Sequence, residues 1–256
     1  MKITIDGKQY EAEKGEYILS VCKRNGIAIP TLCDSDALPG QGSCRLCIVE
    51  VIDRGWAKVV TSCLYPITKQ VEVLTKSEKI MSMRKTIITL LTARVPQNEY
   101  MIKLKNEYGV LDEEIERFKL DDLENCILCG LCVKACEEVG INAISTVNRG
   151  VTKKISTPYD EPSEGCIGCG ACSFVCPTGA IIMKDTKDIR TIWGKTFKLL
   201  KCEKCGSYFT TKQHFDYVTK KLNEFKREEL CEDCKKKIVS EKFRDVSENI
   251  NLTINN

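Results

Sequence analysis

Seventeen cysteines, arranged in three groups, constrain the fold of this 256-residue chain more than any other feature of its sequence. The first residues, MKITIDGKQYEAEKGE, do not read as a signal peptide, so a cytoplasmic location is expected. Cytoplasmic thiols are kept reduced, which favours metal ligands over disulfides. The groups contain four, eight and four cysteines, and only Cys22 is left over.

The rest of the composition argues against some classes of function. With 43% hydrophobic and 29% charged residues, the chain is typical of a globular protein. No apolar run approaches the ~18–20 residues that cross a membrane, so no membrane association is expected. The net charge of +3 is too small to indicate a nucleic-acid partner, although the segment from Lys195 onward is more basic than the remainder.

The central group is an internal repeat, CILCGLCVKACEEVG from Cys126 and CIGCGACSFVCPTGA from Cys166. In two-cluster bacterial ferredoxins the run C-x2-C-x2-C-x3-C sends its fourth cysteine to the other cluster. The repeat therefore predicts two [4Fe–4S] clusters, whereas two zinc sites are the alternative. The ligands of the first cluster would be Cys126, Cys129, Cys132 and Cys176, and those of the second Cys166, Cys169, Cys172 and Cys136.

Each central motif also predicts a loop, a helix and then a strand. The cysteine that ends the second motif is followed by Pro177, whereas Glu137 follows Cys136. We expect Glu137 at the start of a helix, where a carboxylate is favoured by the backbone N–H groups.

The N-terminal group predicts a [2Fe–2S] site in a small sheet with one helix across it. The segment begins with a hairpin at Asp6-Gly7 and continues with a helix in EYILSVCKRNG that ends near Gly26. Cys22 is expected to be a buried core thiol on that helix. The predicted ligands are Cys33, Cys44, Cys47 and Cys63, spaced C-x10-C-x2-C-x15-C around the glycine-rich stretch PGQGSC. A zinc site is the alternative, but the ten-residue gap is unlike paired zinc knuckles.

The C-terminal group consists of two CxxC knuckles in KCEKCGSYF and LCEDCKKK. The predicted ligands of a structural zinc ion in a zinc-ribbon or treble-clef module are Cys202, Cys205, Cys231 and Cys234. A further iron–sulfur cluster is the alternative. His214 lies between the knuckles and is expected to be a surface or packing residue, and the polar stretch SENINLTINN is expected to be loose or docked on a partner.

Two helices are predicted between the first two cysteine groups. The first has Ile80, Met83, Ile87 and Leu91 on one face and stops before Pro96. The second starts with Asn98 as its cap and closes on Gly109. The methionines are interpreted as core filler.

The stretches ENCILCGLCVKACEEVG, STVNRG, CIGCGACSFVCPTGAI and PGQGSCRLCIVEV resemble the large iron–sulfur subunit of respiratory complex I. They are also similar to the N-terminal regions of iron-only hydrogenases and of NAD-linked formate dehydrogenases. The resemblance covers about residues 1–185. Many of these relatives have a His-plus-three-Cys cluster in the linker, but residues 77–125 contain neither His nor Cys, so that cluster is expected to be absent.

The predicted architecture is α+β with four parts. A β-grasp [2Fe–2S] ferredoxin-like domain spans residues 1–76 and a helical linker spans 77–120. A 2[4Fe–4S] ferredoxin-like domain spans 121–187, and a zinc-ribbon-like module with a polar tail spans 188–256.

The resemblance implies an electron-transfer subunit with three clusters in series, within a complex such as a flavin-based electron-bifurcating NAD(P)H:ferredoxin oxidoreductase. The resemblance does not extend to a catalytic domain for hydrogen or formate, so that chemistry is not expected within these residues. The chain also has no G-x-G-x-x-G fingerprint and no base–nucleophile pair, so flavin and NAD(P) are expected on partner subunits, with soluble ferredoxin as a further partner. The alternatives are an iron–sulfur subunit of a hydrogenase or formate dehydrogenase complex, a free-standing multi-cluster ferredoxin, and a zinc-dependent interaction or nucleic-acid module.

Overall fold

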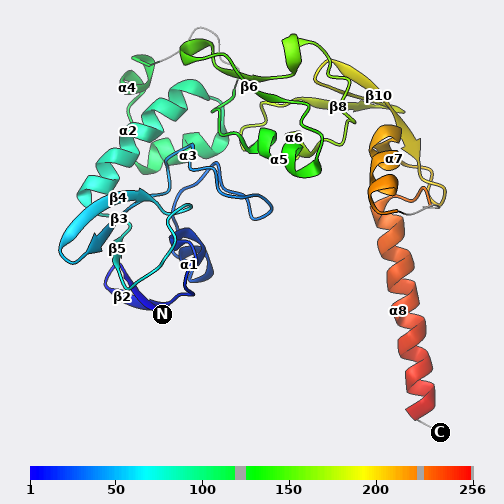
Figure 1. Cartoon of the computed structure of the whole chain (residues 1–256), viewed down its shortest axis with the longest axis horizontal. Coiled ribbons are helices and arrows are strands. Elements are labelled where there is room, and N and C mark those ends of the chain that lie inside the picture. The colour runs from blue at the N-terminus through cyan, green and yellow to red at the C-terminus, as the bar shows by residue number, and fades with distance from the viewer. Residues whose placement is uncertain (119–124, 224–227, 255–256) are drawn as a thin grey trace. The chain divides into compact units, whose positions relative to one another are not determined.

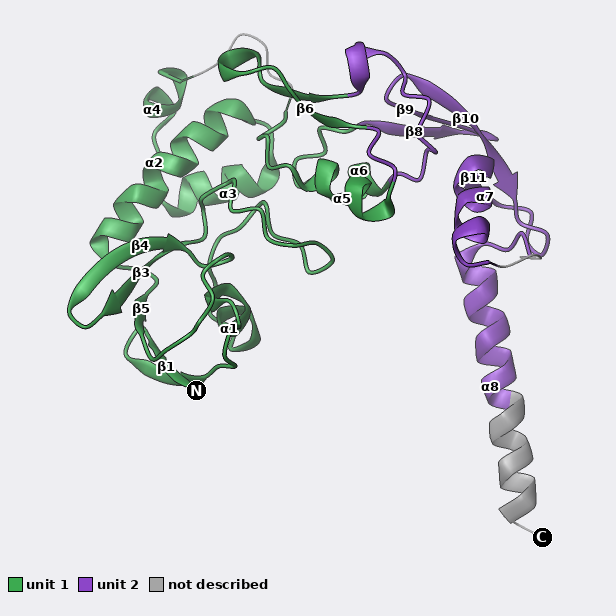
Figure 2. Ribbon diagram, in the orientation of Figure 1, with its two compact units in different colours: residues 1–140, 144–156, 171–181 green, residues 141–143, 157–170, 182–256 purple. Residues whose placement is uncertain are grey.

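The computed structural model describes residues 1–118, 125–223 and 228–254, with side chains up to residue 244. It divides into two compact units, which Figure 2 shows in green and purple. Unit 1 comprises residues 1–140, 144–156 and 171–181, and unit 2 comprises residues 141–143, 157–170 and 182–256.

A five-stranded mixed sheet forms the N-terminal part of unit 1 (Figure 1). Its strands, in chain order, are β1 (Lys2–Ile5), β2 (Lys8–Glu11), β3 (Ile48–Asp53), β4 (Trp56–Thr61) and β5 (Glu72–Leu74). They lie in the order β2-β1-β5-β3-β4, with β1 and β5 parallel and the other neighbours antiparallel. The predicted hairpin is confirmed, since Asp6 and Gly7 both have the positive φ angles that a type I′ turn requires.

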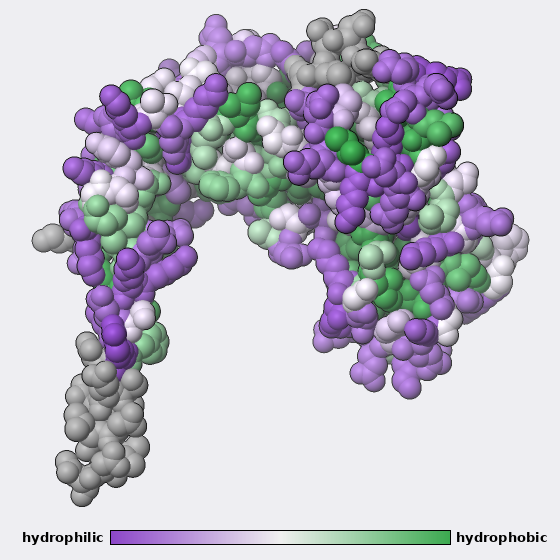
Figure 3. Space-filling model, turned by 180° about the vertical axis from the view of Figure 1, so that it is seen from behind, coloured by the Kyte–Doolittle hydropathy of each residue, from purple (hydrophilic) through white to green (hydrophobic). Residues whose placement is uncertain are grey.

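Helix α1 (Ile18–Arg24) packs on this sheet through Ile18, Val21 and Cys22, which share one buried cluster with strand residues such as Val49 and Val51. Cys22 is fully buried, so its predicted place in the core is confirmed. On the face that Figure 3 shows, hydrophilic side chains surround a smaller hydrophobic area on this N-terminal part.

Three helices follow the sheet in unit 1, namely α2 (Glu78–Arg94), α3 (Glu99–Glu107) and α4 (Asp112–Glu116). Helix α2 packs against α3, α4 and β3. The first four residues of β3 are all buried, because the α1 side covers one face of the strand and α2 covers part of the other. The predicted Asn98 cap of α3 is confirmed, since its side chain accepts a hydrogen bond from Met101 N.

The predicted apolar face of α2 is confirmed in part, since Ile87 and Leu91 pack half-buried against the core. Ile80 is buried as expected, but Met83 is 40% exposed, so its interpretation as core filler is wrong. The fully buried side chains of the helix include Arg84 and Ile88, four residues apart on a neighbouring stripe. Methionine does fill the core at Met101, which is fully buried in α3.

The central repeat folds as loop, helix and strand, as predicted. Its elements in unit 1 are α5 (Leu131–Val139), β6 (Ser145–Val147), the 3-10 helix η1 (Gly150–Thr152), β7 (Lys154–Ser156) and α6 (Ala171–Phe174). Strands β6 and β7 form an antiparallel hairpin, and α5 packs against α6.

The predicted position of Glu137 at a helix start is wrong. Helix α5 begins at Leu131, just after Gly130 with its φ of 81°, so Glu137 lies in the last turn. A carboxylate is disfavoured there by the helix dipole. Lys134 offsets this, since its ammonium lies 3.1 Å from the Glu137 carboxylate and 3.3 Å from that of Glu138.

Unit 2 contains a four-stranded antiparallel sheet with the strand order β11-β10-β9-β8. Its elements are the 3-10 helix η2 (Pro158–Asp160), β8 (Met183–Thr186), β9 (Ile189–Ile192), β10 (Lys195–Lys201), β11 (Tyr208–Thr211), α7 (Lys212–Lys221) and α8 (Glu232–Ile254). Helix α7 packs against β10 and β11. The predicted boundary after residue 187 falls in the turn of the β8–β9 hairpin, and the boundary after residue 120 lies outside the described residues.

The backbone of the predicted polar tail continues α8 as far as Ile254. Its side chains, and residues 255–256, lie outside the described part of the chain.

Candidate metal centres

The four N-terminal cysteines lie in two close pairs. Cys33 Sγ is 3.4 Å from Cys44 Sγ, and Cys47 Sγ is 3.3 Å from Cys63 Sγ. These distances are far longer than a disulfide bond of about 2.05 Å and approach the ~3.8 Å between two sulfurs on one tetrahedral metal with 2.3 Å bonds. All four thiols are buried. Two thiolates for each of two irons is the ligand arrangement that a [2Fe–2S] cluster needs.

The glycine-rich loop before Cys44 packs against the segment that contains Cys63. A Cβ atom on Gly40 would lie 3.0 Å from Cys63 O. Gly42 has a φ of +60°, and a Cβ there would lie 2.4 Å from Leu64 Cδ1. Glycine is therefore required for close packing of this loop against residues 63 and 64.

Within the first pair, one sulfur is already prepared for metal binding. The Cys33 thiol donates to Cys44 Sγ, and Cys44 N donates to Cys33 Sγ at 3.3 Å. The hydrogen bond from Cys33 lowers the pKa of the Cys44 thiol to about 6. The same hydrogen bond raises the pKa of the Cys33 thiol. A cation bound by this pair would hold both sulfurs as thiolates, the form that coordinates metal.

Arg84 is a residue near this site that the sequence did not predict. Its guanidinium is 1% exposed and donates from Nε to Leu46 O at 3.1 Å and from Nη2 to Ile48 O at 2.6 Å. These two carbonyls flank Cys47. The signal available in the sequence was its position between Ile80 and Ile88, four residues from each.

The first central motif shares a hydrophobic core with the N-terminal site. Cys33 and Cys44 belong to the same buried cluster of side chains as Ile127, Cys129 and Leu131. The α2 residue Arg94 donates from Nε to Cys126 O. Helix α2 thus contacts the ligand loop of the predicted [2Fe–2S] cluster and that of the first predicted [4Fe–4S] cluster.

Cys176 lies near the first motif rather than only near its own. Burial raises the pKa of the Cys129 thiol to about 11, with smaller contributions from the charges of Cys176 and Cys126. Burial likewise raises the pKa of Cys132 to about 12, with contributions from Cys129 and Cys126. Cys44 and Cys172 also contribute to the raised pKa values of Cys129 and Cys132, respectively, so these interactions agree with the predicted ligand set without singling it out. A bound cluster would keep its ligands as thiolates.

The second predicted set is divided between the two units. Cys136 and Cys172 lie in unit 1, whereas Cys166 and Cys169 lie in unit 2, so the assignment of these four ligands to one cluster remains a prediction.

Side chains from the unit 2 sheet support the loop that contains Cys166 and Cys169. Lys195 Nζ donates to the carbonyl oxygens of Ser163, Glu164 and Cys166, each at 2.9 Å. Arg190 donates from Nη1 to Gly168 O at 3.0 Å and is also bound to the Asp185 carboxylate. The loop of Cys166 and Cys169 is therefore hydrogen-bonded to the sheet whose β10–β11 hairpin contains Cys202 and Cys205.

The four C-terminal cysteines converge, with all Sγ atoms within 4.8 Å of one another. The converging ligands are Cys202, Cys205, Cys231 and Cys234. The first two follow β10 in the β10–β11 hairpin, and the second two lie at the start of α8. A hairpin knuckle combined with a helix start corresponds to the treble-clef alternative.

Backbone N–H groups make this C-terminal site suited to a metal. Cys231 N donates to Cys202 Sγ at 3.3 Å. The N–H groups of Cys205 and Cys231 lower the pKa of the Cys202 thiol to about 6. Four convergent sulfurs within tetrahedral reach fit a single zinc ion, whereas the two separate pairs at the N-terminal site fit a binuclear centre. His214 is not one of the converging ligands, and its Nδ1 lies 2.9 Å from Thr210 Oγ1.

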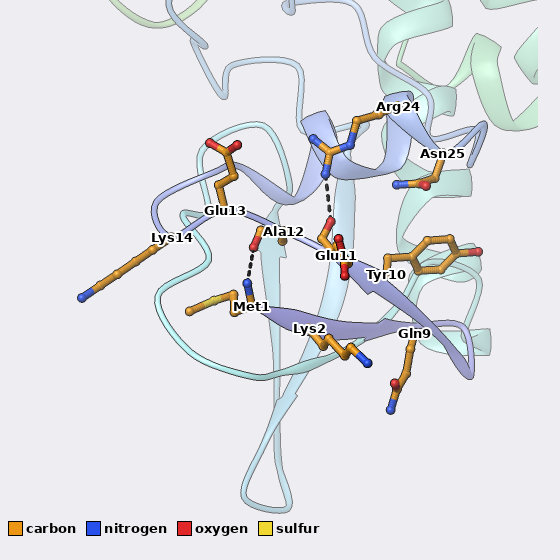
Figure 4. A pocket seen from close by; sticks show the side chains of 10 residues that line it. All are labelled: Met1, Lys2, Gln9, Tyr10, Glu11, Ala12, Glu13, Lys14, Arg24 and Asn25. Atoms are coloured by element: carbon orange, nitrogen blue, oxygen red, sulfur yellow. Dashed lines mark hydrogen bonds between the residues drawn. The ribbon is translucent and has the colours of Figure 1, made fainter.

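An open hollow near the N-terminus shows no catalytic arrangement (Figure 4). Within it, the Met1 amine donates to Ala12 O at 2.6 Å, and Arg24 Nη2 donates to Glu11 O at 2.8 Å. None of its lining residues is a cysteine or histidine.

No described helix is both long and apolar enough to span a membrane.

Family models match two parts of the chain. Residues 1–78 match a 2Fe-2S iron-sulfur cluster binding domain, and residues 121–183 match a 4Fe-4S dicluster domain. The predicted ferredoxin-like domains of these two types, with mixed helix and sheet content, are therefore confirmed.

Curated relatives belong to oxidoreductases and hydrogenases. The chain is 32% identical over 90% of its length to the NADPH-Fe(3+) oxidoreductase subunit alpha of Geobacter sulfurreducens. It is 31% identical over 71% of its length to the NADP-reducing hydrogenase subunit HndD of Solidesulfovibrio fructosivorans. It is 28% identical over 81% of its length to an NADH-quinone oxidoreductase subunit of Rhizobium meliloti. The chain spans 30%, 36% and 27% of these relatives, respectively.

A solved structure shares the fold over much of the chain. A chain of an NAD+-reducing [NiFe]-hydrogenase in the H2-reduced state matches with a TM-score of 0.53 and 28% identity. The match covers 61% of this chain and 74% of that one. The resemblance to iron–sulfur subunits of the complex I and hydrogenase type, predicted from the cysteine motifs, is thereby confirmed.

Proposed function

We propose that this chain, with its 2Fe-2S and 4Fe-4S dicluster domains, is an electron-transfer subunit of a cytosolic multi-subunit NAD(P)H-linked oxidoreductase. Three clusters form its electron path. The paired thiols of the N-terminal site bind one [2Fe–2S] cluster, and the central repeat binds two [4Fe–4S] clusters with exchanged fourth ligands. The convergent C-terminal sulfurs bind one structural Zn2+.

The observation that best supports an electron path is the buried cluster that includes Cys33 and Cys44 together with Cys129. Electron transfer weakens steeply with distance, so two centres in series need ligand loops that share a packed core. The α2 contacts agree with this requirement. Arg84 and Arg94, which contact the two loops, are ten residues apart, which is about 15 Å along a helix.

The chemistry of the complex would take place on partner subunits. We propose that a flavoprotein partner binds flavin and NAD(P), and that this chain passes single electrons between that flavin and an acceptor. The Geobacter relative is named as part of an NADPH oxidoreductase, which supports a pyridine-nucleotide-linked partner. Flavin-based electron bifurcation, with soluble ferredoxin as a further partner, is the specific form of this activity that we propose.

A hydrogenase complex is the second candidate. The identity to subunit HndD and the fold shared with the [NiFe]-hydrogenase chain favour it. In that case the same electron path would connect the flavoprotein with a hydrogen-activating subunit instead of with ferredoxin. A subunit of a formate dehydrogenase complex or a free-standing ferredoxin are further alternatives.

Anaerobic purification of the native complex, followed by identification of its subunits, tests the proposal. We expect a flavoprotein to co-purify, and we expect NADH or NADPH to reduce the clusters of this chain, as observed by electron paramagnetic resonance (EPR). Reduction by hydrogen with a co-purifying hydrogenase subunit would favour the second candidate. A chain that purifies alone and is not reduced by either nucleotide in the cell extract would contradict both.

A further inference from the structure

Arg84 combines full burial with contacts to the N-terminal ligand loop. It lies in the middle of α2, and its guanidinium is fixed by three acceptors. Two of these are the carbonyls of Leu46 and Ile48, on either side of Cys47, and the third is the Tyr108 hydroxyl, 3.3 Å from Nη1. An arginine whose only role was to cover part of a helix surface would be expected to extend its guanidinium into water.

No carboxylate forms an ion pair with Arg84 in the part of the chain that the structure describes. The acidic residue on the adjacent strand, Glu50, is engaged elsewhere, with Lys79 Nζ at 3.0 Å and Ser77 Oγ at 3.0 Å. A buried charge is costly unless an opposite charge compensates for it. A bound anionic group beside Arg84 would supply such a countercharge.

A [2Fe–2S] cluster with four thiolates is such a group. Its net charge is negative in the oxidised state and becomes more negative by one electron on reduction. Cys47, one of the proposed ligands, lies between the two carbonyls that Arg84 contacts. The guanidinium therefore lies next to the ligand loop on the α2 side.

We propose that Arg84 is a positioning residue that fixes the Cys44–Cys47 ligand loop and raises the reduction potential of the [2Fe–2S] cluster by its positive charge. This inference rests on the cluster assignment of the proposed function. With a [2Fe–2S] cluster bound, its reduction would take one electron from the partner's reduced flavin and convert one Fe(III) to Fe(II). A fixed cation stabilises the more negative reduced cluster more than the oxidised one.

The test is an EPR-monitored redox titration of the full-length chain, purified anaerobically. The variants are Arg84→Gln, Arg84→Lys and Lys85→Gln, and Cys47→Ser identifies which signal belongs to the [2Fe–2S] cluster. We expect Arg84→Gln to lower the reduction equilibrium constant at least tenfold, about 59 mV for one electron. Lys85→Gln removes the neighbouring cation of α2, whose partner is Glu114, and should leave the potential near that of the wild type.

Arg84→Lys separates charge from position. A lysine keeps the charge but cannot contact both carbonyls with one planar fork. We expect its potential to stay closer to the wild-type value than that of the Gln variant, with a shifted EPR spectrum and faster loss of iron to a chelator. Unchanged [4Fe–4S] signals and thermal unfolding would show that the fold is intact.

Several results would overturn the inference. One is an Arg84→Gln chain with two irons in its N-terminal site and a wild-type potential. If the Gln variant does not retain the cluster, an Arg84→Lys chain identical to the wild type in potential, spectrum and chelator resistance would also overturn it. A wild-type chain without any [2Fe–2S] signal would instead overturn the cluster assignment itself.

Discussion

At the scale of single residues, hydrogen-bond donors near the sulfur distinguish the unassigned thiol from two of the proposed ligands. Cys22 is fully buried on α1 among apolar side chains, and burial raises the pKa of its thiol to about 12. The proposed ligands Cys44 and Cys202 are buried too, but hydrogen bonds lower the pKa values of both to about 6. Donors near the sulfur therefore distinguish these two proposed ligands from the core thiol, whereas burial raises the pKa of the proposed ligands Cys129 and Cys132 as it does that of Cys22.

The first prediction concerns this inert thiol. In the native protein at pH 8, iodoacetamide should leave Cys22 unmodified, because the neutral thiol is a poor nucleophile and the site is closed to solvent. Peptide mass spectrometry checks the result, with urea-unfolded protein as the control in which Cys22 reacts. Modification of Cys22 in the folded protein at the rate of a free thiol would contradict its place in the core.

A second residue-scale prediction concerns the exchanged fourth ligands. Cys176→Ser should damage the cluster of Cys126, Cys129 and Cys132, because the fourth cysteine of each C-x2-C-x2-C-x3-C run is expected to bind the other cluster.

Cys136→Ser is the reciprocal variant, expected to damage the other [4Fe–4S] cluster. EPR and Mössbauer spectra that resolve the two clusters are the measurement. The exchange is excluded if each variant loses only the cluster whose other ligands belong to its own motif.

At the scale of elements, a positively charged side chain from a neighbouring helix or strand contacts each of three loops that are proposed to bind iron. Arg84 and Arg94 of α2 donate to carbonyls beside Cys47 and at Cys126, and Lys195 of β10 donates to that of Cys166. Iron–sulfur clusters with thiolate ligands are anionic, so cations at their loops compensate for the buried negative charge.

The third prediction tests this support at β10. Lys195→Met keeps the length of the side chain and removes three hydrogen bonds to the loop of residues 163–166. Because charge-assisted hydrogen bonds contribute about 1.5–3 kcal/mol, we expect iron from this cluster to be lost to a chelator at least about tenfold faster.

Lys198→Met is the matched control, since Lys198 is exposed on the same strand. The rate of iron release, followed by absorbance, should be unchanged in this variant. Equal rates in both variants would show that the Lys195 contacts do not stabilise the loop.

The sequence predicted the features whose signals are local. The Asp6-Gly7 hairpin and the Asn98 cap depend on backbone conformations that a few residues determine, and both occur as expected. Arg84 was missed because its burial depends on the Leu46–Ile48 segment, far away in the sequence. Glu137 was misplaced because α5 begins at Leu131, directly after Gly130 and well before Cys136. The cysteine spacing does not indicate this early helix start.

At the scale of the whole molecule, the two ferredoxin-like domains were predictable from the sequence, whereas the continuity of the unit 2 sheet was not. The cysteine spacing predicted the two ferredoxin-like domains, since ligand geometry determines the loops directly. It did not predict that the sheet beginning at β8 continues into the hairpin of Cys202 and Cys205. Strand pairing of this kind depends on contacts between polar, weakly patterned segments, such as Met183–Thr186.

The central claim is that three redox centres in one chain form an electron path, with zinc as a structural ion outside that path. Metal analysis combined with an EPR redox titration of the anaerobically purified chain tests this claim most directly. The account predicts about ten irons and one zinc per chain and three separate reversible one-electron centres. About fourteen irons without zinc, or iron that is not reversibly reduced, would contradict it.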